Sequence, residues 1–288
     1  MTVTAPGAGR AYVLVHGGWH GAWAFGKVAP LLALEGHHVL AEDLPGHGLR
    51  AQFPRSYRHR PLDMGKFAAE PSPVSGLTLA DYADQVEVAV RLLAERMPGH
   101  QVILVGHSMA GLVLHRVGEA IPQLISRLVY LSAWMTAGGR SFWRYAAAPE
   151  MAATKINSIV IGDPTSTGAL RVDFRSADPA YRALVKSALA ADVDDDDWEA
   201  AANLLTPDAP AAPTAEPVAL TASRWGAIPR TYISCTADQA LPLAAQRRFI
   251  AEADELTPDN PTDVREVAAS HSPFISRPQE LASILLEL

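Results

Sequence analysis

The chain has 288 residues, of which 49% are hydrophobic and 19% charged, and its formal net charge is −7. This composition is typical of a globular protein with a substantial core, and the acidic balance argues against a nucleic-acid partner, which usually requires a basic patch. No apolar run approaches the roughly 18 residues of a membrane span. Met1–Arg10 lacks the order of a signal peptide, and the single cysteine, Cys235, fits a reducing compartment. We therefore expect a cytoplasmic protein without a membrane partner.

The first half of the chain alternates between apolar strands and helices. Strands are expected at 11–15, 39–41, 101–105 and 127–131, and helices at 22–34, at 79–97 and after residue 111. The helix at 79–97 has Thr78 as its expected cap, and its apolar residues recur at i, i+3 and i+4. Residues 49–77 contain four prolines and no clear periodicity, so we expect an irregular surface excursion there.

The alternation breaks between Trp134 and Trp225 and then resumes. The later elements are expected as a strand at 231–235, a helix at 244–252, a strand at 264–267 and a closing helix at 278–288. Consecutive apolar strands joined by helices predict an α/β fold with a mostly parallel, twisted sheet and helices on both faces. Residues 1–133 and 226–288 would form this core. Residues 134–225 would be an inserted cap, since long irregular segments of compact domains are often functional lids.

The stretch Val102–Gly111 contains a serine, Ser108, in a turn between two apolar runs. Apolar residues end abruptly at Gly106, Ser108 stands in a turn of small residues, and a second apolar run begins at Leu112. A strand, a sharp turn with serine at its apex and a helix are the parts of a nucleophile elbow. The alternative interpretation is a glycine-rich turn that holds its serine by chance.

A serine hydroxyl becomes a nucleophile when a base lies beside it and a carboxylate orients that base. Nine of the ten histidines lie at or before His115, and only His271 follows the resumed sheet, so His271 is the candidate base. Asp238 lies three residues beyond the strand at 231–235 and is the candidate acid. It could also cap the helix that begins near Leu241, and the two roles are compatible.

Acyl transfer also needs donors for the negative oxygen of its tetrahedral intermediate. The backbone N–H of Met109, at the start of the elbow helix, is one candidate donor. Gly18, in the loop after the first strand, is the other, with Gly17 as the alternative. We expect His16 and His20 to build this loop rather than to take part in the chemistry.

These motifs resemble landmarks of the α/β-hydrolase superfamily. Leu14–Trp23 resembles the loop after the first strand in the branch that holds plant methyl esterases, polyneuridine aldehyde esterase and the α/β-fold hydroxynitrile lyases. The stretch 43–48, the turn at Ser108, the stretch 236–238 and His271 fall where landmarks of that family would. The likeness covers about residues 11–134 and 229–288. The resemblance implies that Ser108 is the nucleophile, that His271 is the base and acid, and that Asp238 orients His271. It also implies that the backbone amides of Met109 and Gly18 are the oxyanion donors.

Two departures from the family pattern bear on the chemistry. Ala110 stands where the usual G-x-S-x-G elbow has its second glycine, but Gly111 follows, and we expect the elbow to form. Hydroxynitrile lyases of this branch have a lysine directly after the histidine and a threonine in the first-strand loop. This chain has Ser272 and Gly17 at those positions, which favours hydrolysis over lyase chemistry.

The sequence therefore predicts a serine hydrolase that cleaves a carboxylic ester of a small, mainly apolar molecule through an acyl-enzyme intermediate. The alternatives are a thioester or lactone hydrolase of secondary metabolism, a C–C lyase of the hydroxynitrile type, and a receptor-like binding protein with a residual triad. Candidate substrate contacts are Gly17, Trp19, Trp134, Phe142 and Trp143. Each cap aromatic could equally pack within the cap itself.

No cofactor or metal is expected, because the chain has neither a phosphate loop nor a dinucleotide fingerprint. The acidic run Asp194–Asp197 has no histidine nearby and is better explained as the solvated start of a helix beside Trp198. The expected partner is the small-molecule ester alone, and a homodimer is an assembly that the sequence leaves open.

Overall fold

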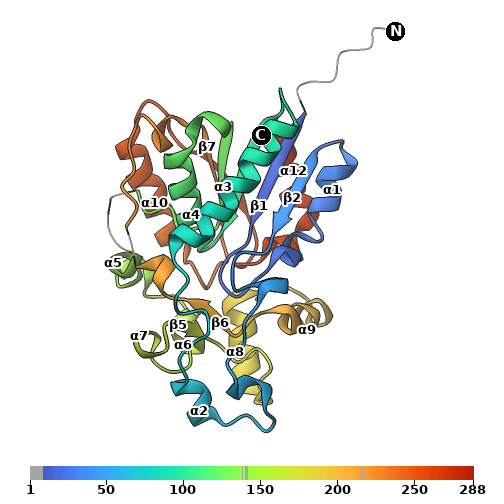
Figure 1. The fold of residues 1–288 in the computed structure, drawn as a ribbon, viewed down its shortest axis with the longest axis vertical. Helices are drawn as coiled ribbons and strands as arrows, with labels where there is room; N and C mark the ends of the chain where they lie inside the picture. Colours follow the sequence, from blue (N-terminus) through green and yellow to red (C-terminus); the bar gives the residue numbers. More distant parts are fainter. Residues whose placement is uncertain (1–8, 138, 140–141, 216) are drawn as a thin grey trace.

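The computed structural model describes residues 9–137, 139, 142–215 and 217–288, and a six-stranded sheet lies at its centre (Figure 1). The strand order is β2-β1-β3-β4-β7-β8, and all neighbouring strands are parallel. The bounds are β1 (Arg10–Val15), β2 (His38–Glu42), β3 (Gln101–His107), β4 (Arg127–Leu131), β7 (Arg230–Cys235) and β8 (Asp263–Val267). The predicted fold class and its strands are confirmed. Most of Met1–Arg10, which we expected not to be a signal peptide, lies outside the described residues.

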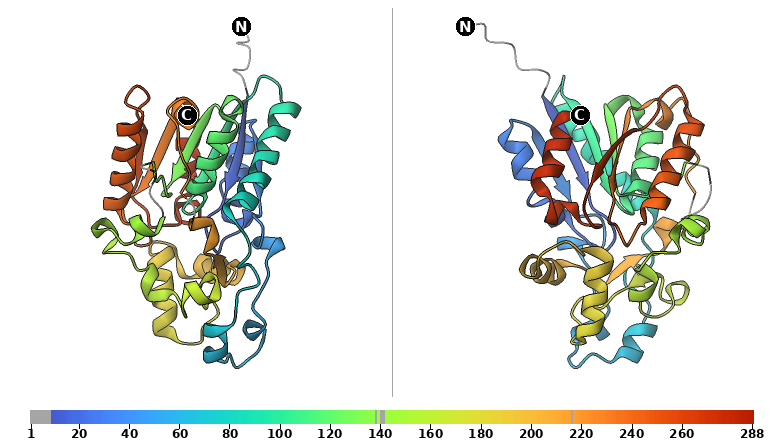
Figure 2. Two further views of the ribbon diagram at one scale, coloured as in Figure 1. Left: turned by 60° about the vertical axis from the view of Figure 1, so that its left-hand side comes forward. Right: turned by 180° about the vertical axis from the view of Figure 1, so that it is seen from behind.

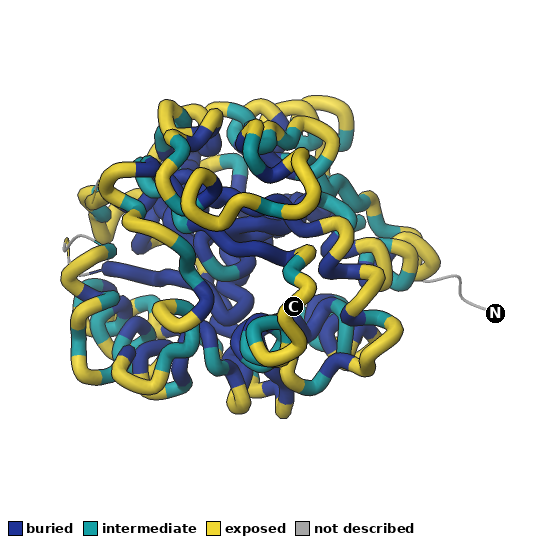
Figure 3. The backbone as a smooth tube through the Cα atoms, turned by 90° about the horizontal axis from the view of Figure 1, so that it is seen from below, coloured by how far each residue is buried: buried dark blue, intermediate teal, exposed yellow. Residues whose placement is uncertain are grey.

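Helices cover both faces of this sheet (Figure 2). The helices α3 (Leu79–Arg96), α4 (Ala110–Ala120) and α10 (Leu243–Leu256) pack on one face, and α1 (Ala29–Leu34), α11 (Pro273–Ser276) and α12 (Pro278–Glu287) on the other. Side chains alternate between the two faces of a strand. In β1, Val13 and Val15 join one hydrophobic cluster, and Tyr12 and Leu14 join the other. The central strands β1, β3, β4 and β7 are therefore buried on both sides, whereas the edge strands β2 and β8 are partly exposed (Figure 3).

Local sequence signals explain where two of the helices begin. The Thr78 side chain accepts from the Asp81 amide at 3.3 Å, and the Asp81 carboxylate accepts from the Thr78 amide at 2.8 Å, so a capping box starts α3. The prediction of one helix over 22–34 is wrong. A 3-10 turn, η1 (Ala22–Phe25), is followed by the separate helix α1, because Pro30 favours the first turn of a new helix.

The cap lies beyond the carboxyl ends of the strands (Figure 1). It contains a two-stranded antiparallel sheet and several short helices. The elements are α5 (Phe142–Ala146), η5 (Pro149–Met151), α6 (Ile156–Ile159), α7 (Pro164–Thr167), β5 (Ala169–Arg171), α8 (Pro179–Leu189), α9 (Asp195–Leu204), β6 (Asp208–Pro210), η6 (Ala212–Thr214) and, where the chain returns to the sheet, η7 (Trp225–Ala227). Asp194 caps α9 by accepting from the Asp197 amide at 2.8 Å, so the acidic run begins a helix there. The exact division of the chain into core and cap stays a prediction.

Residues 49–77 depart from the expected surface excursion. The segment forms η2 (Gly48–Arg50), η3 (Ser56–Arg58) and α2 (Met64–Ala69), and it lies along the cap (Figure 1). The rings of Tyr57 and Phe67 stack with centroids 5.1 Å apart, and both residues are buried. The remaining short turn, η4 (Pro122–Leu124), lies between α4 and β4. No helix in the described part of the chain is both long and apolar enough to cross a membrane.

A fully buried arginine of the cap, Arg171, joins this segment to the cap. Arg171 in β5 donates to both carboxylate oxygens of Asp208 in β6, each at 2.7 Å. The same guanidinium donates to the carbonyl oxygens of Phe67 and Glu70 and lies over the Phe67 ring. One side chain therefore satisfies a buried carboxylate and two backbone carbonyl groups from another part of the chain.

We predict that Arg171→Met lowers the free energy of unfolding by about 3–5 kcal/mol, because it leaves the buried Asp208 carboxylate without its partner. Replacing both residues by apolar ones of similar volume should recover part of this loss. Lys66→Met, at an exposed side chain of α2, serves as the control and should leave stability nearly unchanged. Urea unfolding measures all three variants, and a loss below about 1 kcal/mol for Arg171→Met would contradict the prediction.

Candidate active site

Ser108 lies in the turn between β3 and α4 with a left-handed backbone, φ +54°. Such a conformation is unfavourable for a residue with a side chain and persists only where surrounding contacts hold it. Here the Ser108 amide donates to the Leu131 carbonyl at 3.3 Å, and its carbonyl accepts from the amides of Gly111 and Trp134 at 3.1 and 3.0 Å. The turn holds the serine hydroxyl at the carboxyl end of the sheet.

Two glycines make this turn sterically feasible. A Cβ atom at Gly106 would lie 2.5 Å from the Leu114 side chain, and one at Gly111 would lie 2.2 Å from the Trp134 carbonyl oxygen. Ala110 begins α4 and is fully buried. The backbone contact that excludes a side chain therefore falls at Gly111, which explains why the elbow forms with alanine at position 110.

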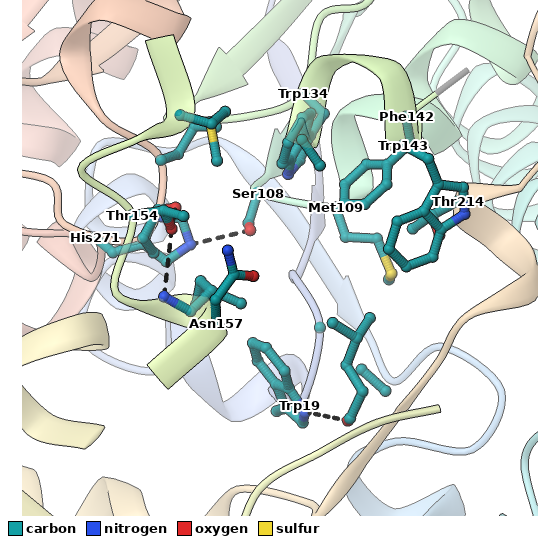
Figure 4. A pocket seen from close by; sticks show the side chains of 18 residues that line it. Trp19, Ser108, Met109, Trp134, Phe142, Trp143, Thr154, Asn157, Thr214 and His271 are labelled. Carbon is teal, nitrogen blue, oxygen red and sulfur yellow. Dashed lines mark hydrogen bonds between the residues drawn. The ribbon is translucent and has the colours of Figure 1, made fainter. Parts of the chain in front are cut away.

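The structure brings Ser108, His271 and Asp238 together, although they follow three different strands. The Ser108 hydroxyl lies 2.9 Å from Nε2 of His271, and Nδ1 of His271 lies 2.6 Å from Oδ2 of Asp238 (Figure 4 draws the first of these bonds). Because an ionised carboxylate only accepts, Nδ1 carries the proton and Nε2 is free to accept from the serine. The other carboxylate oxygen accepts from the amides of Ala240 and Leu241 at 2.7 and 2.8 Å. Asp238 thus orients the histidine and also holds the turn before α10.

Sequence reasoning missed Ser132, which follows β4. Its hydroxyl donates to Oδ2 of Asp238, the same oxygen that faces His271, and its side chain is fully buried. The residue has φ +39°, so its backbone is also held in an unusual conformation. The triad pattern points to a carboxylate, and Ser132 has a hydroxyl. A polar residue directly after a buried strand was the signal that could have identified Ser132.

Buried histidines hold the loops around the serine. Nε2 of His16 accepts from the Leu44 amide at 3.0 Å, so its Nδ1 donates to the Gly17 carbonyl at 2.8 Å. His20 donates likewise to the Gly18 carbonyl at 2.8 Å. Burial lowers the pKa of His20 to about 3 and holds the pKa of His16 well below its ordinary value, so both are neutral. These histidines fix the orientation of the loop peptides, as expected from the sequence.

The candidate oxyanion donors face the same space as Ser108. Gly18 and Met109 both line the pocket that contains Ser108 and His271, and neither amide donates to an acceptor in the described part of the chain. Gly17 does not line this pocket. A Cβ atom there would lie 2.8 Å from Cβ of Ser108, so its role is to let the loop approach the serine. His107, which the sequence did not single out, lies 2.9 Å from the His271 carbonyl and positions that loop.

The pocket above Ser108 is mainly apolar and has a volume of about 750 Å³, including the part open to solvent. Trp19, Trp134, Phe142 and Trp143 all line it, as Figure 4 shows. Trp134 and Phe142 also contact each other, with centroids 4.2 Å apart, so these aromatics both pack within the protein and face the pocket. Cap residues that the sequence did not identify complete the lining, among them Met151, Thr154, Asn157, Leu170 and Thr214.

Comparison with known proteins places this architecture in a family. The sequence profile of the alpha/beta hydrolase family matches residues 12–284. The chain belongs to this family. Within the part of this alpha/beta hydrolase that the structure describes, no group of three or more histidine, cysteine or acidic side chains could hold a metal ion.

Relatives agree with the branch suggested by the sequence motifs. The hydrolase is 30% identical over 282 residues to putative methylesterase 11, chloroplastic, of Arabidopsis thaliana, covering 96% of this chain and 63% of that protein. It is 27% identical over 287 residues to polyneuridine aldehyde esterase of Rauvolfia serpentina, covering 97% and 95% of the two chains. The chain thus spans less than two thirds of the first relative's length. The predicted resemblance to plant methyl esterases and polyneuridine aldehyde esterase is confirmed.

Solved structures share the fold over nearly the whole alpha/beta hydrolase chain. A crystal structure of polyneuridine aldehyde esterase superposes with a TM-score of 0.69 at 25% identity and covers 97% of this chain and 98% of that one. A pyrethroid hydrolase from Sphingobium faniae JZ-2 gives a TM-score of 0.73 at 22% identity, with 96% of each chain covered.

We predict that the alpha/beta hydrolase loses about 1–3 kcal/mol of unfolding free energy when Gly111 is replaced by alanine, because the methyl group meets the Trp134 carbonyl. Ala110→Gly, one residue earlier, is the matched control and should cost no more than about 1 kcal/mol. Chemical unfolding of both variants tests this steric argument. Equal losses would show that the close approach at Gly111 does not constrain the turn.

Proposed function

We propose that this protein is a serine hydrolase that cleaves carboxylic esters through an acyl-enzyme intermediate. The observation that carries this proposal is the hydrogen-bonded series from Asp238 through His271 to Ser108 at the base of a mainly apolar pocket. This arrangement is the one that activates a serine for attack on a carbonyl group. The names of the relatives, two of them plant esterases, support an ester as the substrate.

The geometry supports the following sequence of steps. Oγ of Ser108 attacks the ester carbonyl while Nε2 of His271 takes its proton, and Asp238 stabilises the imidazolium that forms. The amides of Met109 and Gly18 donate to the developing oxyanion. His271 then protonates the leaving alcohol, and the acyl group remains on Ser108. A water molecule, deprotonated by His271, releases the acid and restores the serine.

Hydrolysis fits the surroundings of Ser108 better than lyase chemistry. Ser272 is buried, and its hydroxyl donates to the Leu189 carbonyl at 2.8 Å, so it does not serve the pocket. The described residues that line the pocket include no lysine or arginine that could stabilise a leaving cyanide. Thioesters and lactones have the same electrophilic carbonyl group and belong in the substrate panel beside simple esters.

The pocket lining further suggests a substrate that is apolar apart from one polar group. The hydroxyls of Thr154 and Thr214 already donate to backbone carbonyls at 2.8 and 2.6 Å. The Asn157 side chain has no hydrogen bond in the described part of the chain, and its amide points toward Ser108 and His271 (Figure 4). An oxygen atom near the scissile ester would find its partner in this amide.

We predict that Ser108→Ala lowers hydrolysis of aryl esters of increasing acyl length by at least about 10³-fold, because the nucleophile is lost. Ser283→Ala, at an exposed serine of α12, is the control and should retain the rate. A fluorophosphonate should label the parent protein and not the Ser108 variant. Equal hydrolysis by both proteins would refute the mechanism, and tight retention of uncleaved ligand would favour a receptor.

Asn157→Leu should change substrate preference rather than the basal rate. We predict that it lowers the ratio of kcat/KM for an ester bearing a hydroxyl or keto group to that for its deoxy analogue by about tenfold, the value of one hydrogen bond. Gln52→Leu, which removes an exposed amide outside the pocket, is the control. A ratio that stays the same in both variants would show that Asn157 does not contact the substrate.

A further inference from the structure

We propose that a second cavity in the cap binds a small anion with two or more negative charges. The cavity lies between the segment around η3 and the helices α8 and α9, and it has a volume of about 770 Å³, including the part open to solvent. It shares none of its lining residues with the pocket that contains Ser108. We call it the arginine cavity, after the residues that define it: Arg58, Arg60, Arg175 and Arg182.

The charge balance of the arginine cavity opposes that of the whole chain. Four guanidinium groups line it with a single carboxylate, Glu199, whereas the protein carries a net charge of −7. Arg182 binds Glu199, and Arg60 donates to the backbone carbonyls of Tyr57 and His59. Arg58, Arg60 and Arg175 are exposed, so water screens part of their mutual repulsion, and an anion between them would relieve the remainder.

Two of the guanidinium groups keep their hydrogen-bonding capacity. Within the described residues, the side chains of Arg58 and Arg175 form no ion pair and no hydrogen bond. A further carboxylate near Tyr57, that of Asp173, is buried and accepts from the backbone amide of Arg175 at 3.1 Å. The cavity therefore presents unused N–H donors in a fork geometry that suits the oxygens of a phosphate or a carboxylate.

A buried hydroxyl gives an independent indication of a ligand. Tyr57 lines the arginine cavity, is 3% exposed, and its hydroxyl has no hydrogen-bond partner of acceptable geometry, although the Arg175 amide lies near it. Buried polar groups in proteins are nearly always paired, so an unpaired one calls for an explanation. Burial raises the pKa of this phenol, so it stays a donor. An anion oxygen in the cavity would accept from it.

The arginine cavity also contacts the wall of the reaction pocket. Phe174 lines the cavity, and its ring contacts that of Trp19 with centroids 6.2 Å apart. Trp19 lines the pocket above Ser108 and belongs to the loop with the candidate oxyanion donor Gly18. A bound anion would hold η3, α8 and α9 together at this wall. The ligand we expect carries two or more negative charges on oxygen atoms. Both phosphates and polycarboxylates have this chemistry.

Isothermal titration of the full chain with inorganic phosphate and with citrate tests the proposal, using chloride at matched ionic strength as the reference. Low ionic strength is needed because salt screens exposed charges. We expect Arg58→Gln and Arg175→Gln each to weaken binding about tenfold through loss of charge-assisted hydrogen bonds. Arg55→Gln removes the same charge from the same segment outside the cavity and should change the affinity by less than about twofold.

Each outcome decides the question. Tighter binding of phosphate identifies a phosphate-bearing ligand, and tighter binding of citrate identifies a polycarboxylate. Absence of binding for both anions, or an equal loss in Arg55→Gln, would overturn the proposal. Ser108→Ala should bind either anion like the parent protein, so failure of the proposed ester hydrolysis and failure of the arginine cavity are separately visible. Circular dichroism and urea unfolding, which do not depend on ester hydrolysis, show whether the arginine variants are folded.

Discussion

The carboxylate of Asp238 is the interaction on which the arrangement of this site depends. It accepts from the amides of Ala240 and Leu241, from the Ser132 hydroxyl and from the His271 ring. A buried carboxylate is costly unless several donors satisfy it. Because these donors come from the ends of β4, β7 and β8, satisfying one charge fixes three loops relative to each other. The parallel sheet supplies the common edge, and Asp238 ties its loops into one geometry.

The cap is connected to the same loops, so it acts on the site by more than covering it. Asp192 accepts from the amide and the hydroxyl of Ser270, next to His271. On the other side of the pocket, the Trp19 ring donates to the Leu170 carbonyl, and the Trp19 carbonyl accepts from the Thr206 amide at 2.8 Å. Cap residues thus contact both the loop of the candidate base and the loop of the candidate oxyanion donor. Displacement of the cap would disturb both loops together.

Local patterns were enough to predict the features whose causes are local. The consecutive apolar residues of the central strands, the cap at Thr78 and the order of Ser108, Asp238 and His271 can all be read along the chain. Ser132 and His107 belong to no motif that names their partners, which lie 106 and 164 residues away, so their bonds become visible only in the assembled sheet. Residues 49–77 lacked periodicity for a similar reason. Their order comes from tertiary contacts such as those made by Arg171 rather than from helix or strand propensity.

The packing of the cap also bears on which chemistry the pocket can perform. In the resembling lyases the residue after the histidine is a lysine that faces the reaction. In this chain Ser272 is 1% exposed and donates to the Leu189 carbonyl at the end of α8. A lysine at this position would have to bury its ammonium group against that helix or displace the helix, and burial of an unpaired charge is strongly unfavourable. The packing of the end of α8 against the loop that follows His271 is therefore matched to a small neutral side chain. That match supports ester hydrolysis, in which Asp238 stabilises the imidazolium that forms on His271.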